Sequence, residues 1–426
     1  MADVRPLNAL HYDLDAVGSL QDVVAPPYDV IDAAMRQELL AQSPYNAVAI
    51  DLPKPYGETG PQAEGQGDPY AAAADSIVAW LGAGALVRDS EPAIWAMEQE
   101  YTGPDGGSHV RHGILARVRV EDFDTGTILP HERTLPGPKQ DRLELMRATR
   151  CNLSPIFSLS TIDPWPLAAK ETAVEEPWGE ATDAAGTVTR IWRLPQLNEE
   201  IPALLADAQL LIADGHHRYE TAIAYRDEIG GEGDHNYTLM ALTGLDDPGL
   251  AVYPTHRMLS GFAEDPERQR RLGEGLRELF EIEEVETDRV DPLGEDGVGV
   301  FGLYDSHHKK AFRLRLKDTT ELDRRLEGEP EAYRRLDAAI LETLVLKGLA
   351  GLSEDDILAK RGIGYAKSVE DSLRLIEAGT YDVAFILRPI PVQQTKEICE
   401  SAANMPPKST YFYPKVLTGL VFNPLA

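Results

Sequence analysis

The chain has 426 residues and a formal net charge of −30, and its 43% hydrophobic and 26% charged residues are typical of a globular protein of two or three domains. Such an acidic surface repels nucleic acid and anionic membranes, and no apolar run approaches the about 20 residues that span a bilayer. Cys151 and Cys399 lie far apart and suggest neither a disulfide framework nor a zinc pattern, and the N-terminus lacks the features of a signal peptide. We therefore expect a cytoplasmic protein that binds neither nucleic acid nor membranes.

The first polar motif is a rigid turn near the N-terminus, V-V-A-P-P-Y-D-V-I over 23–31. Its two prolines fix the backbone, so Tyr28 and Asp29 either contact a substrate or belong to a structural turn before the next helix. The elements predicted next are a helix over 33–41, a strand over 47–52, a loop rich in Pro and Gly over 51–67, a helix over 69–81 capped by Asp68, and a hairpin of strands over 93–101 and 109–120.

Basic residues are concentrated in I-L-P-H-E-R-T-L-P-G-P-K-Q-D-R-L-E-L-M-R-A-T-R over 128–150, where a helix is predicted from about residue 139. They are Arg133, Lys139, Arg142, Arg147 and Arg150. In an acidic chain such a cluster indicates an anionic partner, most simply a phosphorylated small molecule. A solvated helix face neutralised by Asp141 and Glu144 is the alternative. It explains Arg147 and Arg150 well and His131-Glu132 between prolines less well, since a carboxylate held in a loop beside positive charge suits a general base.

The least ordinary stretch is Q-L-L-I-A-D-G-H-H-R-Y-E-T-A over 209–222. Its apolar start predicts a buried strand, Asp214-Gly215 a tight turn, and the residues that follow a helix. Backbone N–H groups and the positive end of the helix dipole meet at such a turn and suit a phosphate or a carboxylate. The first helical turn carries His216, His217 and Arg218, which can close around the same anion. An ordinary turn with surface histidines and a paired arginine is the alternative.

Strands and helices alternate along the rest of the chain. We predict strands over 154–160, 188–192, 237–242, 251–253, 281–286, 298–303, 310–316 and 381–387, and helices over 165–177, 197–206, 266–280, 333–349, 368–378 and 394–403. This pattern predicts an α/β fold with a mixed sheet. We expect one region over 1–258 that contains the catalytic core and a second over 259–426 whose tail returns to that core.

Two further polar clusters lie in this second half. The turn P-T-H-R over 254–257 offers His256 and Arg257 as substrate ligands, with an ordinary surface turn as the alternative. The tail M-P-P-K-S-T-Y-F-Y-P-K over 405–415 is basic and rigid, so it either contacts phosphate or docks on the protein. Its polar candidates are Lys408, Ser409, Thr410 and Lys415.

The stretch A-D-G-H-H-R-Y-E-T-A resembles the nucleotide-binding turn of the ParB/sulfiredoxin-like superfamily, with Gly215 and Arg218 at the two fixed places of its Gly-x-x-Arg signature. The version D-G-H-H-R is similar to that of the free serine kinases, which also have an upstream P-H-E element whose glutamate is the catalytic base. Pro130-His131-Glu132 matches that element, so the resemblance implies that Glu132 is the base. Sulfiredoxin has a cysteine where this chain has His216, and the helix-turn-helix of ParB is not readable here, so neither activity is expected.

Over nearly its whole length the chain resembles the bacterial and archaeal family called domain of unknown function 1015. The matching blocks are A-P-P-Y-D-V-I, P-H-E-R-T with K-Q-D-R, D-G-H-H-R, P-T-H-R and M-P-P-K-S-T-Y-F-Y-P-K. The resemblance names a family without naming a reaction.

Together these patterns predict a kinase that transfers phosphate from ATP or ADP to a small hydroxyl metabolite, with free serine as the best guess and Mg²⁺ as the expected ion. The predicted catalytic residues are Glu132 and His131. The predicted nucleotide ligands are Asp214, Gly215, His216, His217, Arg218, Lys139 and Arg142. The predicted substrate ligands are Tyr28, Asp29, His256, Arg257, Lys408 and Ser409, and no metal ligand is predicted.

Two other functions fit the same residues. A nucleotide-binding regulatory module with little turnover would use the D-G-H-H-R turn without needing Glu132. A phosphatase of a phosphorylated metabolite would use the same anion site with water as the acceptor. The sequence also leaves a homodimer open.

Overall fold

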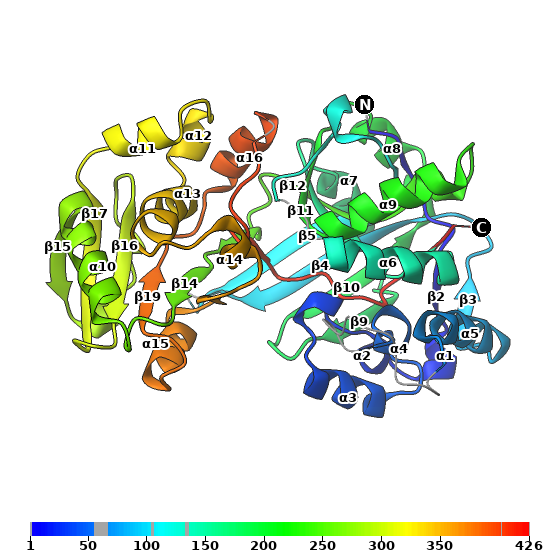
Figure 1. Cartoon of the computed structure of the whole chain (residues 1–426). Helices are drawn as coiled ribbons and strands as arrows, with labels where there is room; N and C mark the ends of the chain where they lie inside the picture. Colours follow the sequence, from blue (N-terminus) through cyan, green and yellow to red (C-terminus); the bar gives the residue numbers. More distant parts are fainter. Residues whose placement is uncertain (1, 55–66, 104–105, 133–135, 402, 426) are drawn as a thin grey trace. The chain divides into compact units, whose positions relative to one another are not determined.

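A computed structural model describes residues 2–54, 67–103, 106–132, 136–401 and 403–425. The chain divides into two compact units (Figure 1). Unit 1 comprises Met1–Pro130, Thr134–Leu250 and Pro414–Ala426, and unit 2 comprises His131–Arg133 and Ala251–Tyr413. The division of the chain into regions 1–258 and 259–426 stays a prediction. Among the described residues, no helix is both long and apolar enough to cross a membrane.

Unit 1 is built on a mixed sheet that contains nine strands within the described part of the chain. The order is β6-β11-β8-β12-β5-β4-β10-β9, with β1 paired to β5. The strands are β1 (Val4–Arg5), β4 (Ile94–Thr102), β5 (Ser108–Arg119), β6 (Ile128–Leu129), β8 (Ile156–Ser160), β9 (Gly179–Thr182), β10 (Val188–Leu194), β11 (Leu210–Asp214) and β12 (Tyr237–Gly244). β11 runs parallel to β6, and β12 parallel to β8, while the other pairs are antiparallel. The predicted α/β class, its mixed sheet and the β4–β5 hairpin are confirmed.

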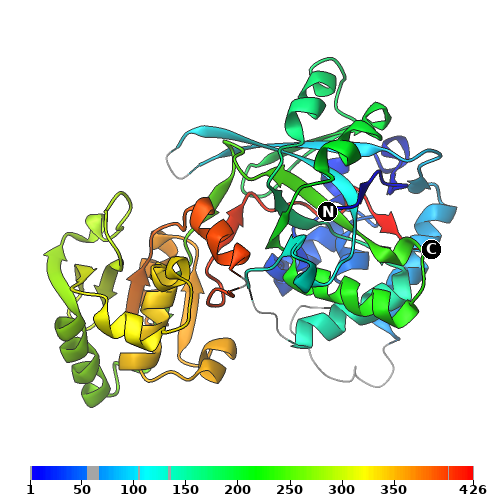
Figure 2. The ribbon, with the colours of Figure 1, turned by 90° about the horizontal axis from the view of Figure 1, so that it is seen from above.

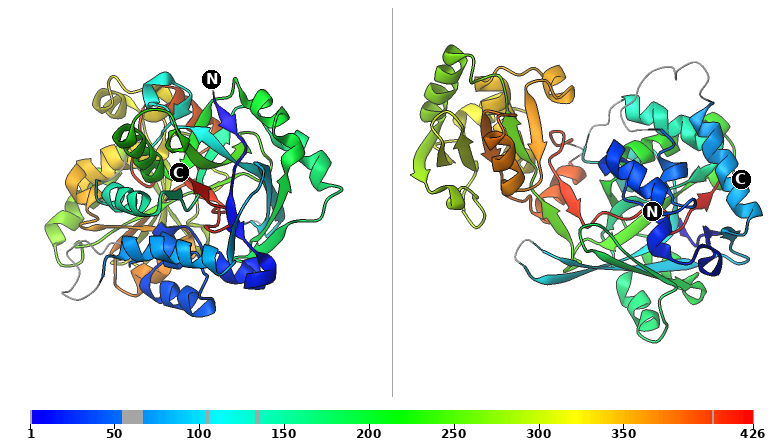
Figure 3. Two further views of the ribbon diagram at one scale, coloured as in Figure 1. Left: turned by 90° about the vertical axis from the view of Figure 1, so that its right-hand side faces the viewer. Right: turned by 90° about the horizontal axis from the view of Figure 1, so that it is seen from below.

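One face of this sheet is apolar, and helices cover it (Figure 1, Figure 3). Ile114, Ile212 and Leu242 of the sheet pack with residues of α7, α8 and α9, such as Tyr219 and Ala222. The helices of unit 1 are α1 (Leu14–Val17), α2 (Leu20–Val23), α3 (Ala33–Gln42), α4 (Val48–Asp51), α5 (Pro69–Gly82), α6 (Pro136–Thr149), α7 (Trp165–Thr172), α8 (Glu200–Leu205) and α9 (His216–Ile229). Two small sheets pair β2 (Leu10–Tyr12) with β3 (Leu86–Arg88) and β7 (Cys151–Asn152) with β21 (Asn423–Pro424).

The strand predicted over 47–52 is wrong, because Val48–Asp51 forms the helical turn α4. The buried Asn46 side chain accepts a hydrogen bond from the Val48 backbone N–H at 3.0 Å and donates to two carbonyls of the preceding segment. The two bonds to the distant preceding segment hold Asn46 so that it starts a helical turn, and they override the β-propensity of the apolar residues. The predicted cap of α5 is confirmed, since Asp68 accepts from the Tyr70 N–H.

Unit 2 contains an antiparallel sheet, which among the described residues has the strand order β15-β17-β16-β19-β14-β18. The strands are β13 (Ala251–Tyr253), β14 (His256–Leu259), β15 (Phe280–Val285), β16 (Val300–Asp305), β17 (Lys310–Leu316), β18 (Ile363–Ala366), β19 (Val383–Ile386) and β20 (Tyr411–Tyr413), with β13 and β20 paired apart from the rest. Helices of the unit lie against its sheet (Figure 2). The core of the unit joins Phe301, Leu314 and Phe385 of the sheet to Leu276 and Ile340 of the helices. The helices are α10 (Pro266–Leu279), α11 (Thr320–Arg325), α12 (Glu331–Arg334), α13 (Asp337–Ile340), α14 (Glu354–Leu358), α15 (Val369–Glu377) and α16 (Val392–Glu400).

The single helix predicted over 333–349 is wrong. α12 and α13 are separate, and a π-helical segment, Leu341–Leu349, continues from α13. Between them, Arg335 binds Asp323 at 2.7 Å, and Leu336 takes an extended conformation that buries its side chain in the core. Both contacts are made with residues distant in sequence, so the amphipathic pattern of the segment could not show the break.

Candidate functional site

The stretch over 210–229 folds as predicted: strand β11 ends at Asp214, Gly215 makes the turn, and α9 begins at His216. Gly215 has φ of 97°, which other residues rarely adopt. A Cβ atom there would lie 2.9 Å from Nε of Arg218, so another residue at this position would displace the Arg218 guanidinium. The turn therefore presents the N-terminus of a long helix at the end of a buried strand, the arrangement that suits an anion.

Asp214 is held between two cations. Its Oδ1 lies 3.1 Å from Nζ of Lys415, and its Oδ2 lies 3.0 Å from Nη2 of Arg218. Burial alone would raise the Asp214 pKa, but Lys415 and Arg218 outweigh it and hold this pKa well below its usual range. The carboxylate is therefore ionised at neutral pH and fixes both cations beside the turn.

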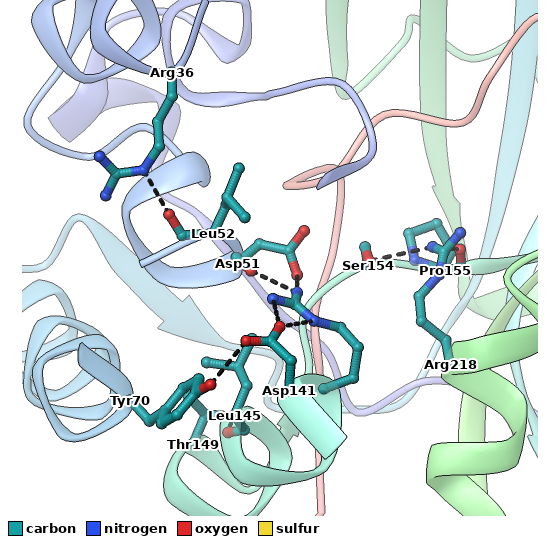
Figure 4. Close-up of polar contacts among 11 residues, drawn as sticks. Arg36, Asp51, Leu52, Tyr70, Asp141, Leu145, Thr149, Ser154, Pro155 and Arg218 are labelled. Atoms are coloured by element: carbon teal, nitrogen blue, oxygen red, sulfur yellow. Dashed lines mark hydrogen bonds and ion pairs between the residues drawn. The ribbon is translucent and has the colours of Figure 1, made fainter. Parts of the chain in front are cut away.

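Arg218 also ties the turn to the residues just before the neighbouring strand β8. Its Nη1 donates to Oγ of Ser154 at 3.2 Å and to the carbonyl of Pro155 (Figure 4). Arg218 thus binds Asp214 within the turn and Ser154 and Pro155 outside it, and these bonds fix the shape of the turn. Next to it, the His216 side chain is buried and His217 is half-buried.

Helix α6 supplies the other two predicted nucleotide ligands, and it packs beside α9. Nζ of Lys139 lies 2.7 Å from Oε2 of Glu220 on α9 and remains partly exposed. The Arg142 side chain is only 5% exposed and donates to the Asp51 carbonyl at 2.6 Å and to Oδ2 of Asp141 at 2.7 Å (Figure 4). Arg142 therefore joins α6 to α4 inside the protein.

The rigid N-terminal turn contributes to this Arg142 cluster. The Tyr28 side chain is buried, and the Arg142 guanidinium lies 4.3 Å from the centre of its ring, while Asp29 is exposed. Burial raises the pKa of Asp51, an effect that the Arg142 charge opposes. These contacts give Tyr28 and Arg142 a structural role in unit 1. Their assignment as ligands stays a prediction.

A small cavity lies between α6, β8 and α9. Asp51, Arg142, Ser154, Arg218 and Thr221 are among its lining residues, and its volume is about 30 Å³. That is room for about one water molecule and far too little for a nucleotide. A nucleotide at the turn would therefore lie outside this cavity.

In unit 2 the structure brings together three of the sequence blocks. The Met405 N–H donates to the His131 carbonyl at 2.8 Å, His131 Nε2 lies 2.8 Å from Oγ1 of Thr410, and the Lys408 N–H lies 3.4 Å from Oε1 of Glu132. Nη2 of Arg257 donates to the Pro407 carbonyl at 3.1 Å. The P-H-E element, P-T-H-R and the segment 405–410 thus form one cluster, called here the Glu132 cluster. Ser409 is buried and donates to the Pro406 carbonyl at 2.6 Å, while Arg133 lies outside the described residues.

The surface turn considered for His256 and Arg257 is wrong for these two residues. Both lie on strand β14, which pairs with β18 and β19, and both side chains are buried. Nδ1 of His256 accepts from the Leu387 N–H at 3.2 Å, and burial lowers its pKa to about 4, so the ring is neutral at pH 7. Burial also lowers the Arg257 pKa, against the attraction of Tyr365 and other groups that include Glu132.

Sequence reasoning missed Arg111 and Gln99, two buried polar residues of unit 1. Arg111 stands in H-V-R-H-G-I-L-A-R-V-R-V, where arginines and histidines alternate with apolar residues as on any half-exposed strand. The pattern carries no signal of burial for Arg111, and only the structure shows this guanidinium buried against the Phe157 ring, 4.2 Å from its centre.

Together, the mixed sheet, the strand–glycine–helix turn and the second unit define an α/β protein with a cationic turn. The chain belongs to the family described as Protein of unknown function (DUF1015), whose profile matches residues 4–339, and the resemblance seen in the sequence is confirmed. No curated protein matches the chain.

Several solved structures are similar to the chain. One is a conserved hypothetical protein from Pyrococcus furiosus, at 17% identity and a TM-score of 0.36, covering 72% of this chain and 95% of that one. Another is a free serine kinase in complex with AMP, at 15% identity and a TM-score of 0.36, covering 70% of this chain and 86% of that one. A third is C-terminally truncated SbnI from Staphylococcus aureus, at 11% identity and a TM-score of 0.37, covering 71% and 85%. Likenesses this distant say nothing of the reaction.

Proposed function

We propose that the protein is a small-molecule kinase that transfers a phosphate group from ATP or ADP to the hydroxyl of a small metabolite, with free serine as the first acceptor to test. The observation that carries this proposal is the Asp214–Arg218 turn. There, a helix N-terminus is flanked by Lys415 and Arg218, both held by Asp214. Helix N–H groups and fixed cations together suit the phosphate chain of a nucleotide.

The turn and the Glu132 cluster would have different tasks. Backbone N–H groups at His216 and His217 bind phosphate oxygens, and Arg218 keeps the turn in shape while adding positive charge. Glu132, the base implied by the resemblance to free serine kinases, accepts the proton of the substrate hydroxyl. The hydroxyl oxygen bonds to the terminal phosphorus as the bond to the leaving nucleotide breaks, which gives a phosphomonoester and ADP from ATP, or AMP from ADP. His131 positions Glu132 through its bonds to the segment 405–410.

The expected Mg²⁺ would neutralise charge on the phosphate oxygens. Within the described part of the chain, no group of three or more His, Cys, Asp or Glu residues could hold a metal ion. The nearest carboxylate of the turn, Asp214, has both oxygens engaged by Lys415 and Arg218. These residues do not form a protein cage for Mg²⁺, so we assign no step and no ligand of this chain to it.

Phosphorus NMR of the purified chain with Mg²⁺, L-serine and either ATP or ADP tests the proposal. A serine-dependent phosphomonoester signal supports it and identifies the donor. Nucleotide binding without turnover for serine or any other small alcohol would instead support a regulatory module. Release of inorganic phosphate from a phosphorylated metabolite without nucleotide would support a phosphatase.

The base assignment has its own test. A Glu132→Gln protein should lose about 10²- to 10⁴-fold in transfer rate while keeping its nucleotide affinity, because general-base catalysis contributes about that much. Glu144→Gln on α6 is the matched control, because the Glu144 carboxylate is exposed and pairs with Arg147 on the same helix. It should leave the transfer rate unchanged. Unchanged turnover in Glu132→Gln would remove Glu132 from the mechanism and leave the nucleotide site unaffected.

A further inference from the structure

Side-chain contacts link Arg111 to the Asp214–Arg218 turn. In the strand register Gln99 lies opposite both Thr189 and Arg111, and Asp214 lies opposite Phe157. The Arg111 guanidinium lies over the Phe157 ring, 4.2 Å from its centre, and Asp214 attracts it electrostatically. The guanidinium therefore contacts Gln99 and the strand residue that is paired with Asp214.

The Arg111 guanidinium is 0% exposed, yet its hydrogen bonding is incomplete. Its Nη2 donates to Oε1 of Gln99, but Nε and Nη1 have no hydrogen-bond partner within the part of the chain that the structure describes. Buried guanidinium groups are normally paired with a carboxylate or a comparable anion, because an unpaired buried charge is costly. Burial lowers the Arg111 pKa to about 9, so the group still carries its charge at neutral pH.

Two carboxylates attract Arg111 electrostatically, and both are engaged by other groups. Asp214 binds Lys415 and Arg218, and Gln99, which bonds Arg111, also donates to the Lys415 carbonyl at 3.0 Å. The oxygens of Asp247 accept from the N–H groups of His112 and Gly249. Within the described part of the chain, no carboxylate is therefore a hydrogen-bond partner of the Arg111 guanidinium.

We propose that Arg111 is an anion-binding residue of the Asp214–Arg218 turn, and that with Lys415 it binds a phosphate group of a polyphosphate. This inference rests on the proposed function for the identity of the ligand, and it adds a strand residue to a site otherwise made by the turn. Phosphate is the ligand class because its oxygens accept several N–H donors at once and its negative charge would pair with the Arg111 guanidinium. Gln99 positions Arg111 and Lys415 together.

Calorimetric titration of the full chain with sodium pyrophosphate, ADP and adenosine tests the inference. Arg111→Met should weaken the affinity for pyrophosphate and for ADP about 10- to 100-fold, the usual value of a charged hydrogen bond. It should leave the affinity for adenosine unchanged. The affinity of Arg111→Lys for pyrophosphate and ADP should lie between those of Arg111→Met and the wild type. Arg119→Met is the matched control, because Arg119 lies on the same strand but pairs with the exposed Glu232. Wild-type pyrophosphate affinity in Arg111→Met would overturn the inference.

Thermal melting separates this role from a purely structural one. If Arg111 binds an anion, the melting temperature of Arg111→Met without ligand should be no lower than that of the wild type, because a buried charge has been removed. Adding pyrophosphate should raise the melting temperature of Arg111→Met less than that of the wild type. The inference would be overturned if Arg111→Met lost much stability without ligand while pyrophosphate raised the melting temperature of Arg111→Lys as much as that of the wild type. If the wild type binds pyrophosphate but transfers no phosphate, the proposed function fails while the inference stands. If it binds no phosphate compound at all, both fail.

Discussion

Two buried arginines of unit 1 differ in what balances their charge. Arg142 is bound by a carbonyl and a carboxylate and lies close to a second carboxylate, that of Asp51. Arg111 is also buried but has one amide oxygen as its hydrogen-bond partner among the described residues. Burial therefore does not tell a structural arginine from a binding one. The difference lies in pairing: a fully paired cation holds elements together, and a partly paired cation near a helix N-terminus is available to a ligand.

The largest effect expected from this comparison is on stability. Arg142→Met removes the cation between Asp51 and Asp141 and should destabilise unit 1 by about 3–5 kcal/mol, the usual cost of leaving a buried carboxylate unpaired. All five tryptophans of the chain lie in unit 1, so urea unfolding followed by tryptophan fluorescence reports on this unit. Arg147→Met on the same helix is the control, since its partners Glu144 and Glu228 are exposed, and it should change little. Equal losses in the two variants would contradict the structural role of Arg142.

His256 shows a third way of burying an ionisable group, which is to keep it neutral. Its pKa is about 4 in the folded state against 6.5 unfolded, so the unfolded chain binds a proton that the folded protein excludes. The contribution of the neutral ring to the free energy of unfolding is fully present above pH 6.5 and is lost as the pH falls toward 4. The loss is about 3 kcal/mol, since one pKa unit corresponds to about 1.4 kcal/mol. Unfolding followed by circular dichroism, after subtraction of the fluorescence-detected transition of unit 1, measures this loss in unit 2. His256→Gln should remove the slope over that range, and a persisting slope would assign it to other groups.

Local sequence signals predicted those parts of the structure that local interactions decide. The strand, glycine turn and helix over 210–229 follow from apolar periodicity and from the one residue that tolerates the turn, and the β4–β5 hairpin is equally local. The misses have long-range causes. Asn46 reaches back to the preceding segment to start α4, and Arg335 bonds to Asp323 where the predicted helix breaks. The burial of Arg111 depends on neighbouring strands that no linear pattern specifies.

The smallest predicted effect concerns Gly215. Gly215→Ala should cost about 1–2 kcal/mol in the stability of unit 1, because alanine is strained at φ of 97° and its Cβ would contact the Arg218 guanidinium. Gly126, in unit 1, offers a matched control: it has the same left-handed helical conformation, with φ of 70°, and no atom lies within 4 Å of a Cβ placed there. Gly126→Ala should therefore carry the backbone strain alone, measured by the same fluorescence-detected urea unfolding. Pyrophosphate affinity should fall in Gly215→Ala and stay unchanged in Gly126→Ala, because only the first moves Arg218 and the N–H groups of the turn. Equal pyrophosphate affinity in the two variants would show that the turn does not contact the anion, and would shift the binding role to Arg111 and Lys415.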